Sequence, residues 1–107
     1  MTPLHTAIED MDITEVKRIL GAGCDPNQPD PDVGGFRPLH LSVDIECEWA
    51  IRRYDEGDEN ARPHATVTRL LVDAGADPSL LDGQGQSAYE IALERQHSEA
   101  LALFDRK

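Results

Sequence analysis

The sequence predicts an all-α fold, a helical repeat solenoid made of antiparallel helix pairs joined by turns. Pro-Leu-His occurs twice, at residues 3–5 and 38–40, and proline suits the first position of a helix because its missing N–H is not needed there. A glycine-containing turn of the kind that ends a helix follows each motif, at residues 21–27 and 73–79. Apolar residues recur at helical spacing before both turns.

The first unit has the clearest pattern of helix signals. Thr2 can cap a helix that begins at Pro3 and runs to about Asp10. Met11-Asp12 forms the turn into a second helix, which ends near Gly23, where glycine can adopt a left-handed conformation. The apolar stripe of that second helix consists of Ile13, Val16, Ile19 and Leu20.

The second unit is longer than the first. Pro3 lies 20 residues before Gly23, whereas Pro38 lies 37 residues before Gly75, so the second unit carries 17 additional residues. We place this insertion at about residues 47–63. Helical spacing of apolar residues continues into it, so the first helix of the unit is expected to run to about residue 54, along Val43, Cys47, Ala50, Ile51 and Tyr54.

The rest of the insertion is polar. Asp55–Asn60 contains no apolar residue and is predicted to be a mobile acidic loop. Thr66 or His64 then starts the second helix of the unit. Its expected core stripe is Val67, Leu70 and Leu71.

The third unit repeats the pattern with weaker signals. Asp82–Gln86 has the composition of a turn, and Ser87–Ala92 occupies the place of the Pro-Leu-His segment. Gln96-His97 is the expected turn between its helices. The last apolar stripe consists of Ala100, Leu101, Leu103 and Phe104.

These elements resemble the ankyrin repeat, a unit of about 33 residues comprising a turn and two antiparallel helices. Thr2–Ala7, Pro38–Ser42 and Gly75–Pro78 carry the resemblance, while residues 88–90 depart from it by reading Ala-Tyr-Glu instead of Pro-Leu-His. The resemblance covers nearly the whole chain except the insertion. It implies a single domain, residues 1–107, with three repeats at about residues 1–33, 34–81 and 82–107.

The charge of the chain bears on its partners. Of 107 residues, 10 are Lys or Arg and 21 are Asp or Glu, which gives a net charge of −11. This charge disfavours nucleic acid and anionic membranes and favours a partner protein with a basic surface. The alternative is that the acidic surface only keeps a small protein soluble. Neither an export signal nor an apolar membrane-spanning run is visible, so we expect a cytoplasmic protein.

No pattern for chemistry is found among the histidines. His5 and His40 occupy the histidine position of the ankyrin motif, and the resemblance implies that their rings hydrogen-bond the backbone of neighbouring turns. His64 is interpreted as a loop or cap residue and His97 as a turn residue. Metal-ligand spacing and nucleophile motifs are both absent. We therefore expect no catalytic residues, no metal and no cofactor, and hence not an enzyme.

The resemblance also implies where a partner would bind. In ankyrin proteins the partner usually contacts the turn tips and the exposed side of the first helix of each unit. On this sequence those positions are mostly acidic, with a few apolar side chains: Glu9, Asp10, Asp32, Val33, Phe36, Asp44, Ile45, Gln84, Gln86, Glu94 and Arg95. For Phe36, packing beneath the turn at residues 29–32 is an equally good interpretation.

Two aromatic residues lie in the insertion. Trp49 lies off the apolar stripe and is interpreted as an exposed anchor for a partner, because aromatic residues are enriched at interface hot spots. Packing of Trp49 onto the neighbouring unit is the alternative. For Tyr54, packing that pins the lengthened helix to its neighbour is the favoured interpretation.

These observations favour a non-enzymatic protein-binding module. Taken as a complete chain, a protein this small is best explained as an inhibitor that masks one basic partner, such as an immunity protein that neutralises a bacterial toxin. The alternative is a regulatory adaptor or small subunit that tethers partner proteins. In either case we expect a monomer when the protein is free.

Overall fold

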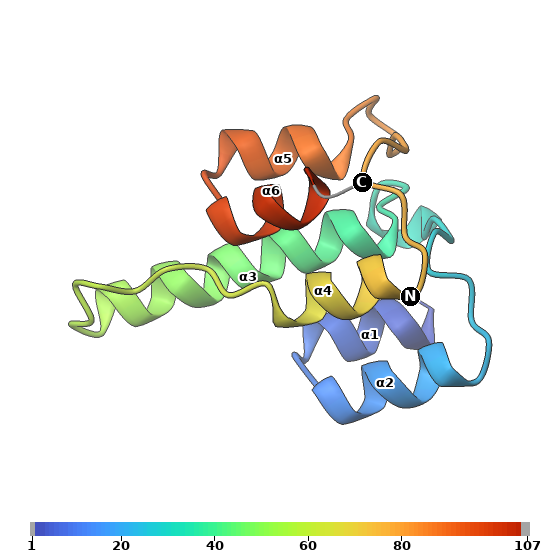
Figure 1. Ribbon diagram of the computed structural model, residues 1–107, viewed down its shortest axis with the longest axis horizontal. Helices are drawn as coiled ribbons and strands as arrows, with labels where there is room; N and C mark the ends of the chain where they lie inside the picture. The colour runs from blue at the N-terminus through green and yellow to red at the C-terminus, as the bar shows by residue number, and fades with distance from the viewer. Residues whose placement is uncertain (1, 106–107) are drawn as a thin grey trace.

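Helices and turns alternate along the chain in the computed structural model, which describes residues 2–105. Six α-helices form within these residues: α1 (Pro3–Glu9), α2 (Ile13–Gly21), α3 (Pro38–Asp55), α4 (Thr66–Asp73), α5 (Ala88–Glu94) and α6 (Ser98–Phe104) (Figure 1). A short 3-10 helix, Pro31–Val33, precedes α3. Over this part of the chain no sheet forms, and two isolated β-bridges are the only β-structure. The all-α prediction is confirmed.

Local signals in the sequence account for the starts of α1 and α5. The backbone N–H of His5 donates to the Thr2 hydroxyl (3.1 Å) at the start of α1, as predicted. In α5, Ser87 and Glu90 form a reciprocal capping box. The fourth helix begins at Thr66, one of the two predicted starts, whereas His64 lies exposed in the preceding segment.

Left-handed backbone conformations end the helices at the predicted turns. Gly23 (φ 93°) follows α2 and Gly75 (φ 102°) follows α4. The tight connections from α1 to α2 and from α5 to α6 instead use Met11 (φ 53°) and Gln96 (φ 57°). A non-glycine residue tolerates this conformation at a small energetic cost.

The helices pack in two rows. Consecutive helices contact each other as the pairs α1–α2, α3–α4 and α5–α6. Across the pairs, α3 contacts both α1 and α5, and α4 contacts both α2 and α6 (Figure 1). The core lies between the rows and includes the fully buried residues Leu4, Ile8, Val16, Leu39, Val43, Val67 and Leu71.

The third helix is much longer than its neighbours. With 18 residues it continues past the ends of α1 and α5 and projects from the body of the molecule (Figure 1). We call residues 45–55 the α3 extension. It ends at Asp55, one residue beyond the prediction, and residues 56–65 return alongside it to α4.

Two buried histidines join each pair of helices to the next turn. His5 Nε2 lies 2.8 Å from the carbonyl oxygen of Phe36, and His40 Nε2 lies 2.8 Å from that of Gln86. A carbonyl oxygen can only accept, so Nε2 donates in both cases. The expectation that these rings hydrogen-bond the backbone of neighbouring turns is confirmed.

A buried carboxylate near the start of the α3 extension, which the sequence did not predict, binds the start of α4. Glu46 accepts hydrogen bonds from the backbone N–H groups of Val67 (3.1 Å) and Thr68 (3.2 Å) at the start of α4. It also accepts from the Thr68 hydroxyl (2.6 Å) and contacts His97 Nε2 (2.8 Å). The α4 N-terminus is thus capped by a side chain from α3, because its own N-cap residue, Ala65, has no capping group.

Within residues 2–105, no helix combines the length and the apolar character needed to cross a bilayer.

Candidate protein-interaction surface

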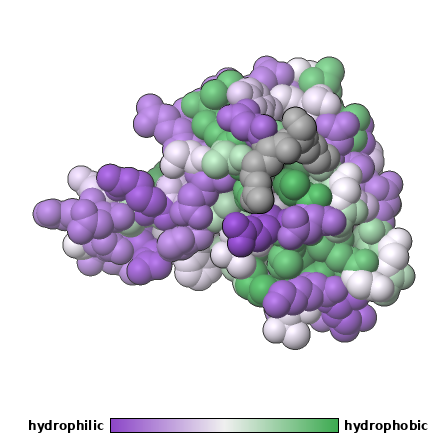
Figure 2. All heavy atoms as spheres, viewed as in Figure 1, coloured by the Kyte–Doolittle hydropathy of each residue, from purple (hydrophilic) through white to green (hydrophobic). Residues whose placement is uncertain are grey.

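Exposed carboxylates lie at the ends of α1 and α5 and at the tip of the α3 extension. Glu9 and Asp10 are exposed at the end of α1, and Glu94 is exposed at the end of α5. Further acidic residues follow at the tip of the extension, where Asp55 and Glu56 are exposed. The projecting end of the molecule is accordingly hydrophilic in Figure 2.

Asp44 on α3 and Arg95 at the end of α5, both predicted partner-binding residues, form an ion pair with each other. Arg95 Nη1 lies 2.5 Å from Asp44 Oδ1, and Arg95 Nη2 lies 2.9 Å from Glu48 Oε1. Burial raises the pKa of Asp44 above its ordinary value, and the charge of Glu48 adds to this effect while that of Arg95 opposes it. Asp44 and Arg95 therefore join α3 to the end of α5, besides lying on the candidate surface.

The predicted residues at the turn tips differ in exposure. Gln84 is exposed, whereas Gln86 is half-buried and donates from its side chain to Glu94 (3.2 Å). Phe36 is half-buried and its ring stacks on His40, with 5.5 Å between centroids. This contact packs the Phe36 ring against the start of α3, whereas packing beneath residues 29–32 stays a prediction. The remaining predicted residues are exposed Asp32 and the half-buried Val33 and Ile45.

The α3 extension presents apolar side chains to solvent. Five large apolar side chains are exposed between residues 2 and 105, and three of them belong to the extension: Trp49 (43%), Ile51 (51%) and Tyr54 (59%). The expected exposure of Trp49 is confirmed. The expectation that Tyr54 is packed is wrong, because α3 projects beyond the helices that would cover its ring.

Depressions flank the extension on two sides. Toward α5, a groove of about 410 Å³ lies between Ile51 and Tyr54 on one wall and Glu94 and Arg95 on the other; we call it the Tyr54 groove. Toward the α1–α2 turn lies a smaller depression of about 180 Å³. We call it the Trp49 pocket, and it is lined by Met11, Glu46, Trp49, Ala50, Arg53, Arg62 and His64.

Sequence reasoning did not single out Ile51, Arg53 or Arg62 as site residues. A signal for Ile51 exists, because Cys47, Ile51 and Tyr54 share one face of a helix through their spacing of four and three residues. No comparable signal identifies Arg62, since it lies in the irregular return segment and meets the pocket only through tertiary structure.

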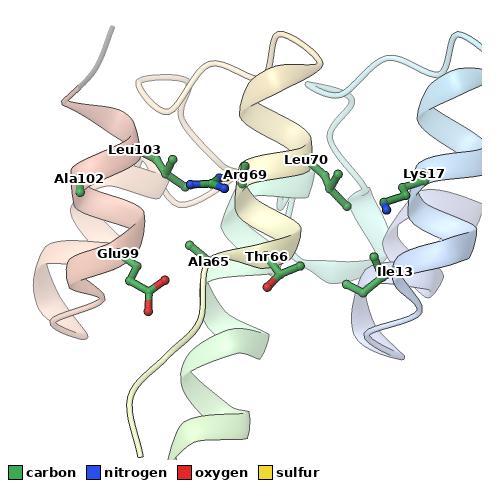
Figure 3. Close-up of a pocket in the computed structure, with 9 residues that line it drawn as sticks. All are labelled: Ile13, Lys17, Ala65, Thr66, Arg69, Leu70, Glu99, Ala102 and Leu103. Atoms are coloured by element: carbon green, nitrogen blue, oxygen red, sulfur yellow. The ribbon is translucent and has the colours of Figure 1, made fainter.

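A separate groove of about 460 Å³ crosses the other row of helices. Ile13 and Lys17 of α2, Leu70 and Arg69 of α4, and Leu103 of α6 line it together with Ala65, Thr66, Glu99 and Ala102 (Figure 3). In Figure 3 Arg69 lies between α4 and α6, and Lys17 lies beside the α2–α4 gap. None of the predicted partner-binding residues lies in this groove, which we call the α2–α4–α6 groove.

Metal-ligating side chains are not grouped on the described part of the chain: no three of its His, Cys, Asp and Glu residues are placed to hold a metal ion. Cys47 is buried, and burial raises the pKa of its thiol to about 11. A thiol with such a high pKa is a poor nucleophile at neutral pH.

No model of a known protein family matches the chain.

Proposed function

We propose that this protein is a non-enzymatic protein-binding module of ankyrin-repeat architecture that inhibits a basic partner by masking it. Support for the repeat architecture comes from contacts that recur one unit apart. The bond from His5 to Phe36 recurs as the bond from His40 to Gln86. In the same way, the β-bridge between Asp30 and Phe36 recurs between residues 81 and 87.

The contact between successive turn tips also supports a stacked array. The backbone N–H of Gly83 donates to the carbonyl oxygen of Gly34 (3.1 Å). Stacking of this kind lets each unit bury the apolar face that it cannot bury alone.

The observation that carries the binding proposal is the composition of the α3 extension and its surroundings. Exposed Trp49, Ile51 and Tyr54 lie on the α3 extension, whose tip is acidic, and Glu94 lines the groove beside Ile51 and Tyr54. Apolar anchors surrounded by polar groups are typical of protein interfaces, and aromatic residues contribute much of the binding energy there.

Electrostatics favour a basic partner. A chain with a net charge of −11 attracts a positively charged surface over long range and accelerates the encounter. In the complex, carboxylates would occupy a site that the partner uses for phosphate or another anion. A bacterial toxin neutralised in the cytoplasm by an otherwise monomeric immunity protein fits this chemistry, and no nucleic acid, membrane or cofactor is required.

The test is capture of the partner followed by an activity measurement. The tagged protein is used to capture proteins from its source cell, and each captured protein is purified and assayed with and without the module. A masking inhibitor gives a one-to-one complex with a basic protein whose activity is lost. If every captured partner remains fully active in the saturated complex, the inhibitor proposal is wrong.

A second candidate function, a regulatory adaptor that tethers two proteins, is favoured by the α2–α4–α6 groove. This groove lies on the other row of helices and carries Lys17 and Arg69, so its charge differs from that of the acidic surface. An adaptor would form a ternary complex in which both partners remain active. Light scattering of the captured complex distinguishes a ternary complex from a one-to-one complex.

A further inference from the structure

The Trp49 pocket is lined by basic side chains, which have no role in the proposed binding of a basic partner. Arg53, Arg62 and His64 form its rim, on a chain that contains only 10 Lys and Arg against 21 Asp and Glu. The guanidinium of Arg52 also lies 5.5 Å from the centroid of the Trp49 ring. A cationic rim on an acidic protein indicates a site for an anionic group.

Carboxylates near this rim pair only weakly with its basic side chains, so these side chains can still bind an anionic ligand. Arg53 is 3.5 Å from Asp58 and His64 is 3.9 Å from Glu99, and all four side chains are largely exposed. Exposed pairs of this kind are weak and exchange readily with solvent or a ligand.

Arg62 is the most available cation of the rim. Its Nη1 donates to its own neighbour, the Ala61 carbonyl oxygen (2.9 Å), and among residues 2–105 no carboxylate lies within ion-pair distance of it. Its other N–H groups can therefore donate to a ligand, because a guanidinium has five. Glu46 also lines the pocket, but its buried oxygens accept from Val67, Thr68 and His97.

The floor of the pocket is apolar. Met11, Trp49 and Ala50 provide it, and the volume is about 180 Å³. Pockets for whole small molecules are usually about 300–1,000 Å³. The space therefore suits one apolar side chain better than a complete small-molecule ligand.

We propose that the Trp49 pocket binds the C-terminal residue of a partner protein whose chain ends in an apolar amino acid. Such a residue carries an apolar side chain and a carboxylate on the same Cα atom. The side chain can enter the pocket while the carboxylate accepts hydrogen bonds from Arg62 and Arg53 at the rim. An internal aspartate or glutamate lacks this combination. The inference rests on the proposal that the chain is a protein-binding module, and it names a feature of the partner.

The test uses the full protein and a short peptide. The probe is the N-acetylated tetrapeptide Gly-Ser-Gly-Leu with a free carboxyl terminus, and its C-terminal amide is the matched control. Trp49 is the only tryptophan of the chain, so its fluorescence and its single indole N–H signal in NMR spectra report on this pocket alone. We expect saturable changes with the acid and an affinity at least about tenfold weaker for the amide, since a hydrogen bond to a charged group contributes about this much.

Two variants locate the binding. Arg62→Gln should weaken binding of the acid at least about tenfold without affecting folding, because Arg62 is exposed. Arg69→Gln, which removes an exposed arginine that lines the α2–α4–α6 groove, should leave the affinity unchanged. Equal affinities of the acid and the amide, or of Arg62→Gln and the unmodified protein, would overturn the proposal.

A further arm separates the peptide terminus from a free aliphatic acid. Octanoate has the same two chemical groups but no peptide chain, and binding as tight as that of the peptide would overturn the assignment to a protein terminus. The absence of any change in the Trp49 signals at millimolar peptide would also overturn it. These failures leave the masking function untouched, because capture of a basic partner and loss of its activity are measured separately.

Discussion

His97 Nε2 lies 2.8 Å from Glu46 Oε1, and both side chains are completely buried. The other ring nitrogen, Nδ1, accepts from the backbone N–H of Ala100 (3.2 Å) at the start of α6. Nδ1 therefore carries no proton, and the proton on Nε2 is donated to the carboxylate. One carboxylate on α3 thus joins the start of α4 to the turn before α6.

Removal of this carboxylate should destabilise the protein strongly. Glu46→Ala leaves the His97 ring and two backbone N–H groups buried without an acceptor, so we expect a loss of about 3–5 kcal/mol in the free energy of unfolding. Urea denaturation measures the loss. Glu59→Gln in the exposed return segment is the control and should change stability by less than about 0.5 kcal/mol. Equal effects of the two substitutions would show that the buried network contributes little.

Protonation of His40 should lower the stability of the folded state. Burial lowers the pKa of His40 below its ordinary value of 6.5. The unfolded chain therefore binds a proton at a higher pH than the folded protein does, so stability should fall as the pH decreases from 6.5 toward the folded pKa. NMR titration of the ring measures this pKa directly. A folded pKa at or above 6.5 would contradict the prediction.

The contact between turn tips requires glycine at residue 83. A Cβ atom there would lie 2.6 Å from the carbonyl oxygen of Gly34, so Gly83→Ala must separate the turns and should cost about 1–3 kcal/mol. Gly21→Ala is the matched control, because its Cβ atom would meet nothing within 4 Å and alanine favours a helix. The melting temperature of Gly83→Ala should therefore lie well below that of Gly21→Ala. The opposite order of melting temperatures would disprove the close contact.

Trp49 should contribute to partner binding more than to folding. Its side chain is 43% exposed, so Trp49→Ala should cost less than about 1 kcal/mol of stability and at least about 2 kcal/mol of binding free energy with the captured partner. Calorimetry measures both quantities. A large stability loss with unchanged affinity would instead assign Trp49 a structural role.

Charge reversal should slow association with a basic partner. The triple variant Glu9→Lys, Asp10→Lys and Glu94→Lys changes exposed carboxylates, whereas Asp44 is kept because it pairs with Arg95. At low salt we expect an association rate about tenfold or more below that of the unmodified protein, and a smaller difference at high salt. Stopped-flow mixing measures these rates. An unchanged rate at low salt would mean that the acidic surface only maintains solubility.

The two cysteines should differ in reactivity toward thiol reagents. With a pKa of about 11, roughly one in a thousand Cys47 thiols is ionised at pH 8, and the side chain is buried. Cys24 is only partly buried. A colorimetric disulfide reagent should therefore modify one thiol per native chain quickly and the second only after unfolding. Modification of both at similar rates would contradict the burial of Cys47.

The sequence by itself determined the helices and the turns between them. Helix caps, proline positions and left-handed glycines are local signals, so Thr2, Pro3, Gly23 and Gly75 identified helix ends without knowledge of the rest of the chain. Periodic apolar residues likewise located the long third helix to within one residue of its end at Asp55.

Tertiary structure decided what these helices present to solvent and to one another. Tyr54 is exposed because α3 extends past the neighbouring helices. Arg62 lines the same pocket as Trp49 because the return segment runs back along the extension. Glutamate is rarely buried in proteins, yet Glu46 is buried against Thr68 and His97. Local signals depend on residues a few positions apart, whereas burial and electrostatic contact depend on residues that folding brings together.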